Sequence, residues 1–241
     1  MNELILILSL IFTFSMILVA YHFFGKTGLY CVSAIATILA NIEVLILIKA
    51  FGMEQTLGNI LFAGTFLITD ILSECEGKKA ANKAVWIGMF SSILFLVLSQ
   101  SWLLYQPSSN DTSMTSIKAI FSNTPRMILA SFVVYAVSQM FDVWLYHKWW
   151  DFTSKKFNDK RKYLWLRNNG STLISQILNT LLFTLFAFWG TYDFSTLMSI
   201  FISSYVIYIF TSLLDTPVVY LARKMHDKKV LKEGKTNDST H

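Results

Sequence analysis

The stretch STLISQILNTLLFTLFAFWG, residues 171–190, is long and apolar enough to cross a membrane, yet its first half carries the amides of Gln176 and Asn179. A spanning helix needs about 20 mainly apolar residues. Similar runs recur along the chain, in which 54% of 241 residues are hydrophobic and 15% are charged. These features predict an all-α fold, that of a polytopic helical membrane protein, with polar groups between its helices.

Apolar runs predict about seven membrane-spanning helices. Their approximate ranges are 3–23, 29–49, 56–75, 83–104, 126–147, 171–190 and 196–221. The third run mixes glycine and polar residues into its apolar pattern, so we expect it to pack among other helices instead of facing lipid. Six spans are the alternative count. The first run lacks a basic start and a clear cleavage site, so we interpret it as a retained span rather than a signal peptide.

The distribution of basic residues tests this topology. With seven spans, seventeen of the 20 Lys and Arg residues lie on one side, and Lys49, Lys118 and Arg126 lie on the other. Because basic loops favour the cytoplasmic face, the pattern predicts an external N-terminus and a cytoplasmic C-terminus. The net charge of +5 follows from this topology, so we interpret the basic loop at 148–170 as a membrane-flanking segment and expect no nucleic-acid partner.

Polar residues recur at similar depths in neighbouring predicted spans. The fifth and sixth spans run in opposite directions and share the pattern S-Q-x-x-[D/N], which places each amide three residues from Asp142 or Asn179 on one helix face. An ionisable group within the membrane is costly unless it faces a partner or a wet cavity, so it marks a candidate functional site. The candidate substrate-binding residues are Asp70, Gln139, Asp142, Gln176 and Asn179, with Asn41, Glu74 and Arg126 as secondary candidates.

Structural roles remain open for several of these residues. Amides commonly join membrane helices by hydrogen bonds, and Asn41 fits that role as well as a binding role. Arg126 is equally consistent with an anchor at the outer interface. For Glu74 and Asp215, near the interface, we favour solvation or interaction with a basic loop.

The candidate set suits two kinds of chemistry. Amides present a donor beside an acceptor, carboxylates accept from amino groups, and aromatic rings stack, which together favour a flat, nitrogen-rich heterocycle. The nearby rings are Trp86, Phe141, Trp144 and Phe183. The same carboxylates also suit proton transfer, and a proton-coupled carrier combines both uses.

Enzyme motifs are absent from the sequence. It contains no H-E-x-x-H, G-x-S-x-G or P-loop pattern, and its four histidines are scattered, so we expect no enzyme, no metal site and no cofactor. Cys31 and Cys75 show no pairing pattern and are interpreted as packing residues. An intramembrane enzyme stays an alternative, but it requires Asp70 and Asp142 to lie together, which the sequence does not show.

Three segments carry a resemblance to a known family: ITDILSECEGKKAA, PRMILASFVVYAVSQMFDVWLYHKWW and LWLRNNGSTLISQILNTLLFTLFAFWG. They resemble the queuosine precursor transporter family, also called the vitamin uptake transporter family, over about residues 29–222. The matching positions are Thr69, Asp70, Glu74, Gly77, Arg126, Ser131, Gln139, Asp142, Arg167, Asn168, Ser171 and Thr172. Asn179 departs from the family, which usually has an acidic residue there.

The resemblance implies a six-helix carrier in the bacterial plasma membrane that imports a purine-like 7-deazaguanine precursor of queuosine. It also implies a likeness to substrate-binding subunits of energy-coupling-factor vitamin transporters. We therefore divide the chain into an accessory helix at 1–25, a six-helix core at 26–222 and a disordered cytoplasmic tail at 223–241. The alternative is a subunit that depends on an ATP-driven module, for which Ala36 and Ala40 offer a docking face, and a homo-oligomer is also compatible with the sequence.

Overall fold

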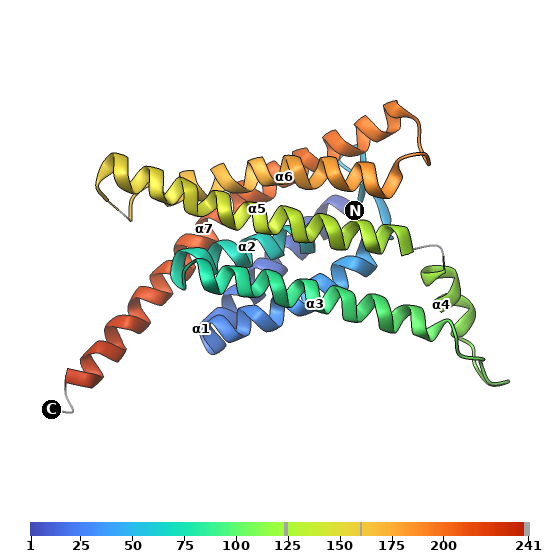
Figure 1. The fold of residues 1–241 in the computed structure, drawn as a ribbon, viewed down its shortest axis with the longest axis horizontal. Helices are drawn as coiled ribbons and strands as arrows, with labels where there is room; N and C mark the ends of the chain where they lie inside the picture. The colour runs from blue at the N-terminus through green and yellow to red at the C-terminus, as the bar shows by residue number, and fades with distance from the viewer. Residues whose placement is uncertain (123–124, 160, 239–241) are drawn as a thin grey trace.

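The computed structural model describes residues 1–122, 125–159 and 161–238, and helices form most of them. Their order is α1 (Asn2–Glu43), β1 (Leu47–Ala50), β2 (Met53–Thr56), α2 (Asn59–Cys75), α3 (Lys78–Trp102), α4 (Met114–Phe121), α5 (Pro125–Phe157), α6 (Leu164–Phe188) and α7 (Phe194–Asp238) (Figure 1). Among the described residues, five helices, α1, α3, α5, α6 and α7, are long and apolar enough to cross a membrane. The predicted class of polytopic helical membrane protein is confirmed.

Helix α1 consists of two arms that meet at Gly25. This residue has φ 57° and ψ −144°, a conformation that favours glycine. The chain folds back there, so that its start lies beside residues 49–51. The Asn2 side chain donates to the Lys49 carbonyl at 2.8 Å, and the Phe51 amide donates to Glu3 at 3.2 Å. The first two predicted spans are therefore the two arms of one helical hairpin.

A β-hairpin occupies the end of the predicted second span. The sequence predicts helix to residue 49, but the helix ends at Glu43 and β1 pairs antiparallel with β2, with Ala50 opposite Met53. The turn residues Phe51 and Gly52 both have positive φ, at 51° and 75°, as the tightest hairpin turns require. The apolar segment at the end of the predicted second span therefore forms a strand and does not extend the helix.

Helix α2 lies at the centre of the bundle. All but three of its 17 residues are buried, and it packs against α1, α3, α5 and α7. Gly64 permits close approach, since a Cβ there would lie 3.1 Å from the Thr13 side chain of the first arm. The expectation that the third apolar run packs among other helices is confirmed.

The segments that flank the long helices differ from the sequence prediction in two places. A short helix, α4, forms in the polar loop before α5, where no element was predicted. Helix α7 continues to Asp238, across most of the segment expected to be disordered. Its extension contacts the loop between α5 and α6: Arg161 and Asp227 form an ion pair at 2.6 Å, and Arg223 donates to the Arg161 carbonyl at 2.9 Å. The division into accessory helix and core stays a prediction.

Candidate functional site

A stripe of buried polar side chains runs along α6, and we call it the α6 stripe. Its members are Arg167, Asn168, Ser171, Thr172, Ser175, Gln176, Asn179, Thr180 and Thr184. At a rise of about 1.5 Å per residue, the stripe is roughly 25 Å long, close to the thickness of a bilayer core. Large apolar side chains such as Ile174, Ile177 and Leu181 are exposed on the same helix. The helix thus turns its polar face inward and its apolar face outward.

Three buried carboxylates contact the first half of the α6 stripe, and we call them the carboxylate trio: Asp70 on α2, Asp142 on α5 and Asp215 on α7. Thr172 donates to Asp70 at 3.2 Å, and Ser175 donates to Asp142 at 2.7 Å. The Asn168 amide donates to Asp215 at 2.8 Å.

The three carboxylates lie close together along α6. Their hydrogen-bond donors are Asn168, Thr172 and Ser175, which lie within about two turns of one helix. One oxygen each of Asp70 and Asp142 has no hydrogen-bond partner in the described part of the chain. The structure brings the two predicted carboxylates together and adds Asp215, for which the sequence favoured solvation or a basic loop. Asp215 is instead 2% exposed.

The amides of the repeated S-Q-x-x-[D/N] pattern make two kinds of contact, one between helices and one within α6. Gln139 donates to Thr65 at 2.8 Å and accepts from Thr69 at 3.1 Å, which joins α5 to α2. Asn179 donates to Gln176 at 3.1 Å within α6. Helices α5 and α6 pack side by side, so the two copies of the pattern face a common interior.

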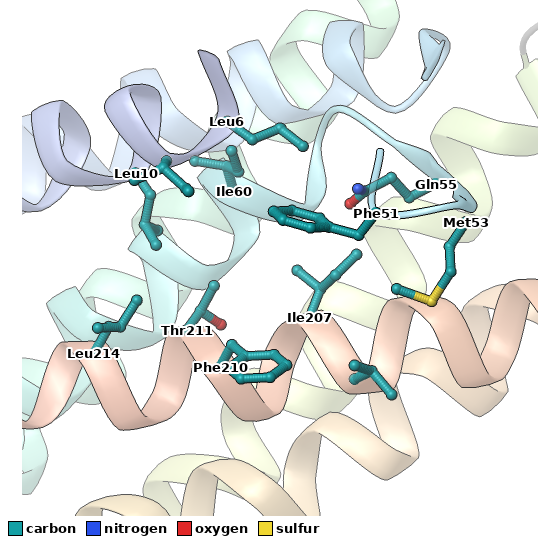
Figure 2. A pocket seen from close by; sticks show the side chains of 12 residues that line it. Leu6, Leu10, Phe51, Met53, Gln55, Ile60, Ile207, Phe210, Thr211 and Leu214 are labelled. Atoms are coloured by element: carbon teal, nitrogen blue, oxygen red, sulfur yellow. The ribbon is translucent and has the colours of Figure 1, made fainter. Parts of the chain in front are cut away.

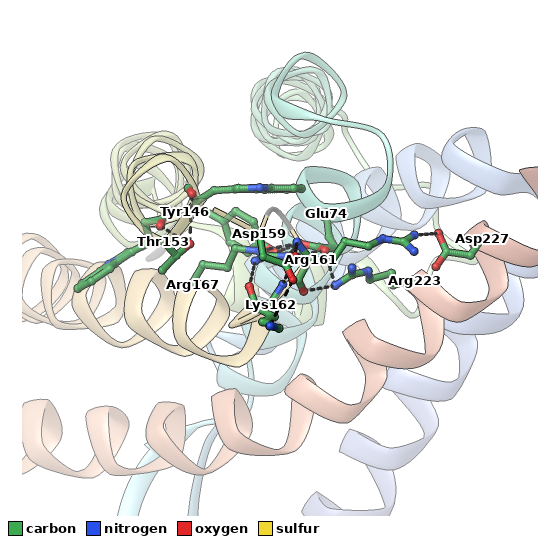
Figure 3. A network of polar contacts seen from close by, with 11 residues as sticks. Glu74, Tyr146, Thr153, Asp159, Arg161, Lys162, Arg167, Arg223 and Asp227 are labelled. Carbon is green, nitrogen blue, oxygen red and sulfur yellow. Dashed lines mark hydrogen bonds and ion pairs between the residues drawn. The ribbon is translucent and has the colours of Figure 1, made fainter. Parts of the chain in front are cut away.

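An ion-pair cluster closes one end of the stripe (Figure 3). Two nitrogens of Arg167 lie 2.6 and 2.9 Å from the two Glu74 oxygens, and Arg223 lies 3.1 Å from the same carboxylate. Tyr146 donates to Glu74 at 2.8 Å, and the Arg167 guanidinium stacks 4.4 Å from the centre of the Trp150 ring. Glu74 therefore interacts with basic residues, as expected for its place near the interface. Its contacts join α2 to α5, α6 and α7.

Two secondary candidates lie apart from the α6 stripe. Arg126 donates to the carbonyls of Phe186 and Trp189 at 2.9 and 2.6 Å, so it satisfies the C-terminal end of α6. Asn41 donates to the Thr37 carbonyl at 2.9 Å and to Ser92 on α3 at 3.2 Å. Both contacts match the structural alternatives, an interface anchor for Arg126 and helix joining for Asn41.

The aromatic rings divide between inside and outside. Trp86 and Trp144 are 60% and 46% exposed, and Phe141 stacks on Trp144 at 5.8 Å. Phe183 lines a small polar cavity beside Asn179. Of the four rings named as neighbours of the candidate site, the two indoles are therefore on the outside of the bundle, and Phe183 lies beside Asn179.

The larger hollows lie away from the predicted site residues. A groove of about 350 Å³ between α1, the β-hairpin and α7 is lined mainly by apolar side chains such as Leu10, Phe51 and Phe210 (Figure 2). A second groove of about 700 Å³ lies at the Gly25 bend, beside Lys229 of α7. The polar cavity beside Asn179 measures about 20 Å³, which is room for about one water molecule.

The A-x-x-x-A pattern of the second arm does not provide an exposed docking face. Ala36 is 4% exposed and Ala40 is fully buried. The two small side chains lie on the face of α1 that packs against this chain's own helices, chiefly α2 and α3. A partner module that docks on this chain would therefore need another surface.

Membrane-length helices around a charged and polar interior define a class, the helical membrane transport proteins. A family model described as "Putative vitamin uptake transporter" matches residues 56–222. A "Probable queuosine precursor transporter" of Bacillus subtilis (strain 168) is 38% identical over 212 residues, which cover 88% of this chain and 90% of that protein. The chain belongs to this vitamin uptake transporter family.

A second relative is more distant. The "Queuosine precursor transporter" of Escherichia coli (strain K12) is 27% identical over 154 residues, which cover 64% of each protein. No solved structure matches the chain.

Proposed function

We propose that this chain imports a 7-deazaguanine precursor of queuosine across the bacterial plasma membrane, with its N-terminus outside and its C-terminus in the cytoplasm. The family membership and the printed names of the two relatives support this substrate. We further propose that inward movement of protons drives the import. The candidate binding residues are the predicted ones that lie on the α6 stripe or contact it, namely Asp70, Asp142, Gln176 and Asn179.

The carboxylate trio is the observation that carries the proton coupling. Asp70, Asp142 and Asp215 come from three helices, are buried, and accept hydrogen bonds from residues within about two turns of α6. Within the described residues, no Lys or Arg forms an ion pair with any of them. Uncompensated buried carboxylates repel one another and favour uptake of protons. A group that takes up a proton from one side and releases it to the other is what coupled transport requires.

The Glu74 ion-pair cluster complements this arrangement. It lies at the α6 end next to the basic loop, which the charge pattern assigns to the cytoplasm. The trio lies further along the stripe, at the level of Asn168 to Ser175. Along α6 the trio therefore lies between the ion pairs and Asn179, so a substrate that arrives from the external side would reach Asn179 before the carboxylates.

Uptake of labelled 7-deazaguanine into vesicles that contain this protein alone tests the proposal. We expect accumulation that an inward proton gradient stimulates and that unlabelled guanine reduces more than adenine does. Asp142→Asn should remove the stimulation, whereas Asp151→Asn, an exposed carboxylate on the same helix, should preserve it.

Other outcomes would separate the alternatives. Binding without accumulation would favour a subunit that needs an energising module. Conversion of the base in detergent, without any vesicle, would favour an intramembrane enzyme. Absence of binding would contradict the proposed substrate.

A further inference from the structure

Three residues that line the polar cavity beside Asn179 carry buried hydrogen-bonding groups without a partner in the described part of the chain. They are the Asn59 amide nitrogen on α2, the Ser131 hydroxyl on α5 and the Thr184 hydroxyl on α6. Each residue is 5% exposed or less. A buried polar group without a partner costs free energy, and more so in a membrane interior, where lipid supplies none. Three unpartnered groups from three helices around one cavity therefore indicate a binding site.

The orientation of Asn59 is fixed by its neighbours. Its side-chain oxygen accepts from Tyr208 at 3.1 Å and from Thr56 at 3.3 Å. Tyr208 lines the same cavity as Asn179 of the α6 stripe. Because the oxygen is occupied, the amide nitrogen is the group that remains free to donate to a bound molecule.

The lining of the cavity selects a class of ligand. It contains hydroxyls, two amides and the phenyl rings of Phe62 and Phe183, but no Lys, Arg, His, Asp or Glu. A charged ligand would lose its hydration there without gaining a counter-charge. A flat, uncharged ring could hydrogen-bond the free groups through its edge and pack its faces against the two phenyl rings.

We propose that Asn59, Ser131 and Thr184 form the site that recognises the edge of the substrate ring, separate from the carboxylate trio. This inference rests on the proposed function and names residues that the binding prediction did not include. Asn59 begins α2, Ser131 lies near the start of α5 and Thr184 near the end of α6, so the site lies at the end of the bundle opposite the Glu74 cluster. The cavity of about 20 Å³ widens on binding, since small-molecule pockets measure about 300–1,000 Å³.

Hydroxyl deletion gives a test in which stability and affinity change in opposite directions. Ser131→Ala and Thr184→Val remove unpartnered hydroxyls, so the empty protein should melt at the same or a higher temperature. The same variants should bind 7-deazaguanine about two- to tenfold more weakly, because each loses one hydrogen bond to the ring. Ser73→Ala removes another buried, unpartnered hydroxyl, from a residue that does not line the cavity, and should leave the affinity unchanged.

Binding to wild type separates this inference from the proposed function. If wild type binds 7-deazaguanine and both variants bind it equally well, the recognition site is overturned while the proposed function stands. A lower melting temperature with unchanged affinity would likewise assign the hydroxyls to helix joining. If wild type does not bind, the proposed function fails first. Guanine should compete with the probe and guanosine monophosphate should not, and equal competition would contradict a site for uncharged rings.

Discussion

The Arg167 guanidinium on α6 lies 2.6 Å from the Glu74 carboxylate on α2, and the two side chains are 0% and 2% exposed. The residues are 93 positions apart in the sequence. Their pairing joins the central helix to the α6 stripe at the end nearest the basic loop. Arg223 of α7 approaches the same carboxylate at 3.1 Å, so one acidic side chain joins three helices.

Removal of the acid should cost more stability than removal of Arg167. Glu74→Gln leaves the Arg167 charge buried without its partner, and loss of one member of a buried ion pair typically costs about 3–5 kcal/mol. Arg167→Met leaves Glu74 with Arg223 and Tyr146, so we expect a smaller loss. Thermal unfolding in detergent measures both.

The double variant Glu74→Gln/Arg167→Met serves as the control for that pair. It should recover part of the stability that Glu74→Gln loses, because no buried guanidinium at position 167 remains unpaired. Strictly additive losses would contradict the assignment of Glu74 to a coupled ion-pair cluster.

Asp142→Asn should reduce transport more than Asn179→Ala does. Asparagine preserves the size of the side chain and an oxygen that accepts from Ser175, so the fold is retained while the exchangeable proton is lost. We expect gradient-driven uptake to fall toward that of protein-free vesicles. Equal uptake by wild type and Asp142→Asn would remove Asp142 from the coupling role.

Arg126 should behave as a helix cap. Its guanidinium donates to two carbonyls at the end of α6, so Arg126→Gln should lower the stability by about 1–3 kcal/mol. We expect no change in affinity for 7-deazaguanine. A selective loss of affinity at full stability would instead return Arg126 to the binding site.

The sequence predicted the membrane class and the position of most spans because hydropathy and loop charge report directly on burial in lipid. It extended the second span over the β-hairpin, since an apolar strand and an apolar helix end have the same hydropathy. The feature that distinguishes the strand from a helix end is the Phe51–Gly52 turn, which hydropathy does not report. The helical extension of α7 was missed because composition does not reveal the contacts of Arg161 with Arg223 and Asp227.

The candidate site was predicted in part for a similar reason. Asp70 and Asp142 were singled out because each is an ionisable group inside a predicted span, and the structure places both side chains against the α6 stripe. The partners of a side chain depend on helix rotation, which the sequence does not specify. Asp215 was therefore assigned to the interface. Single polar residues such as Asn59 and Thr184 belong to no repeated pattern in the sequence.

Gly88 should tolerate no larger residue. A Cβ at this position in α3 would overlap the hydroxyl of Tyr135 on α5 and lie 2.6 Å from its Cζ atom. Overpacking of this kind costs about 1–3 kcal/mol, so Gly88→Ala should lower the melting temperature. Gly170→Ala is a matched control, since its nearest contact would be 3.2 Å from Trp149. Equal effects of the two variants would contradict the close packing of α3 on α5.

Asp193 should contribute a pH-dependent cap before α7. Its carboxylate accepts from the Thr196 hydroxyl at 2.5 Å and from the Ser195 amide at 3.1 Å, and these bonds hold its pKa below the usual value. Because the pKa of Asp193 is lower in the folded than in the unfolded chain, its bonds contribute their full stability above the pKa of the unfolded state, about 3.9. That contribution is lost as the pH falls through the lower pKa of the folded state. The difference in melting temperature between wild type and Asp193→Ala should therefore be constant near neutral pH and shrink in acid. A constant difference down to strongly acidic pH would contradict this assignment.

Proton movement that accompanies substrate is the most direct test of the central claim, that the carboxylate trio couples import to protons. Vesicles with this protein alone, an internal pH indicator and no imposed gradient would receive external 7-deazaguanine. We predict that the interior becomes more acidic with wild type and does not with Asp142→Asn. Uptake of the base by wild type without any change in internal pH would contradict the claim.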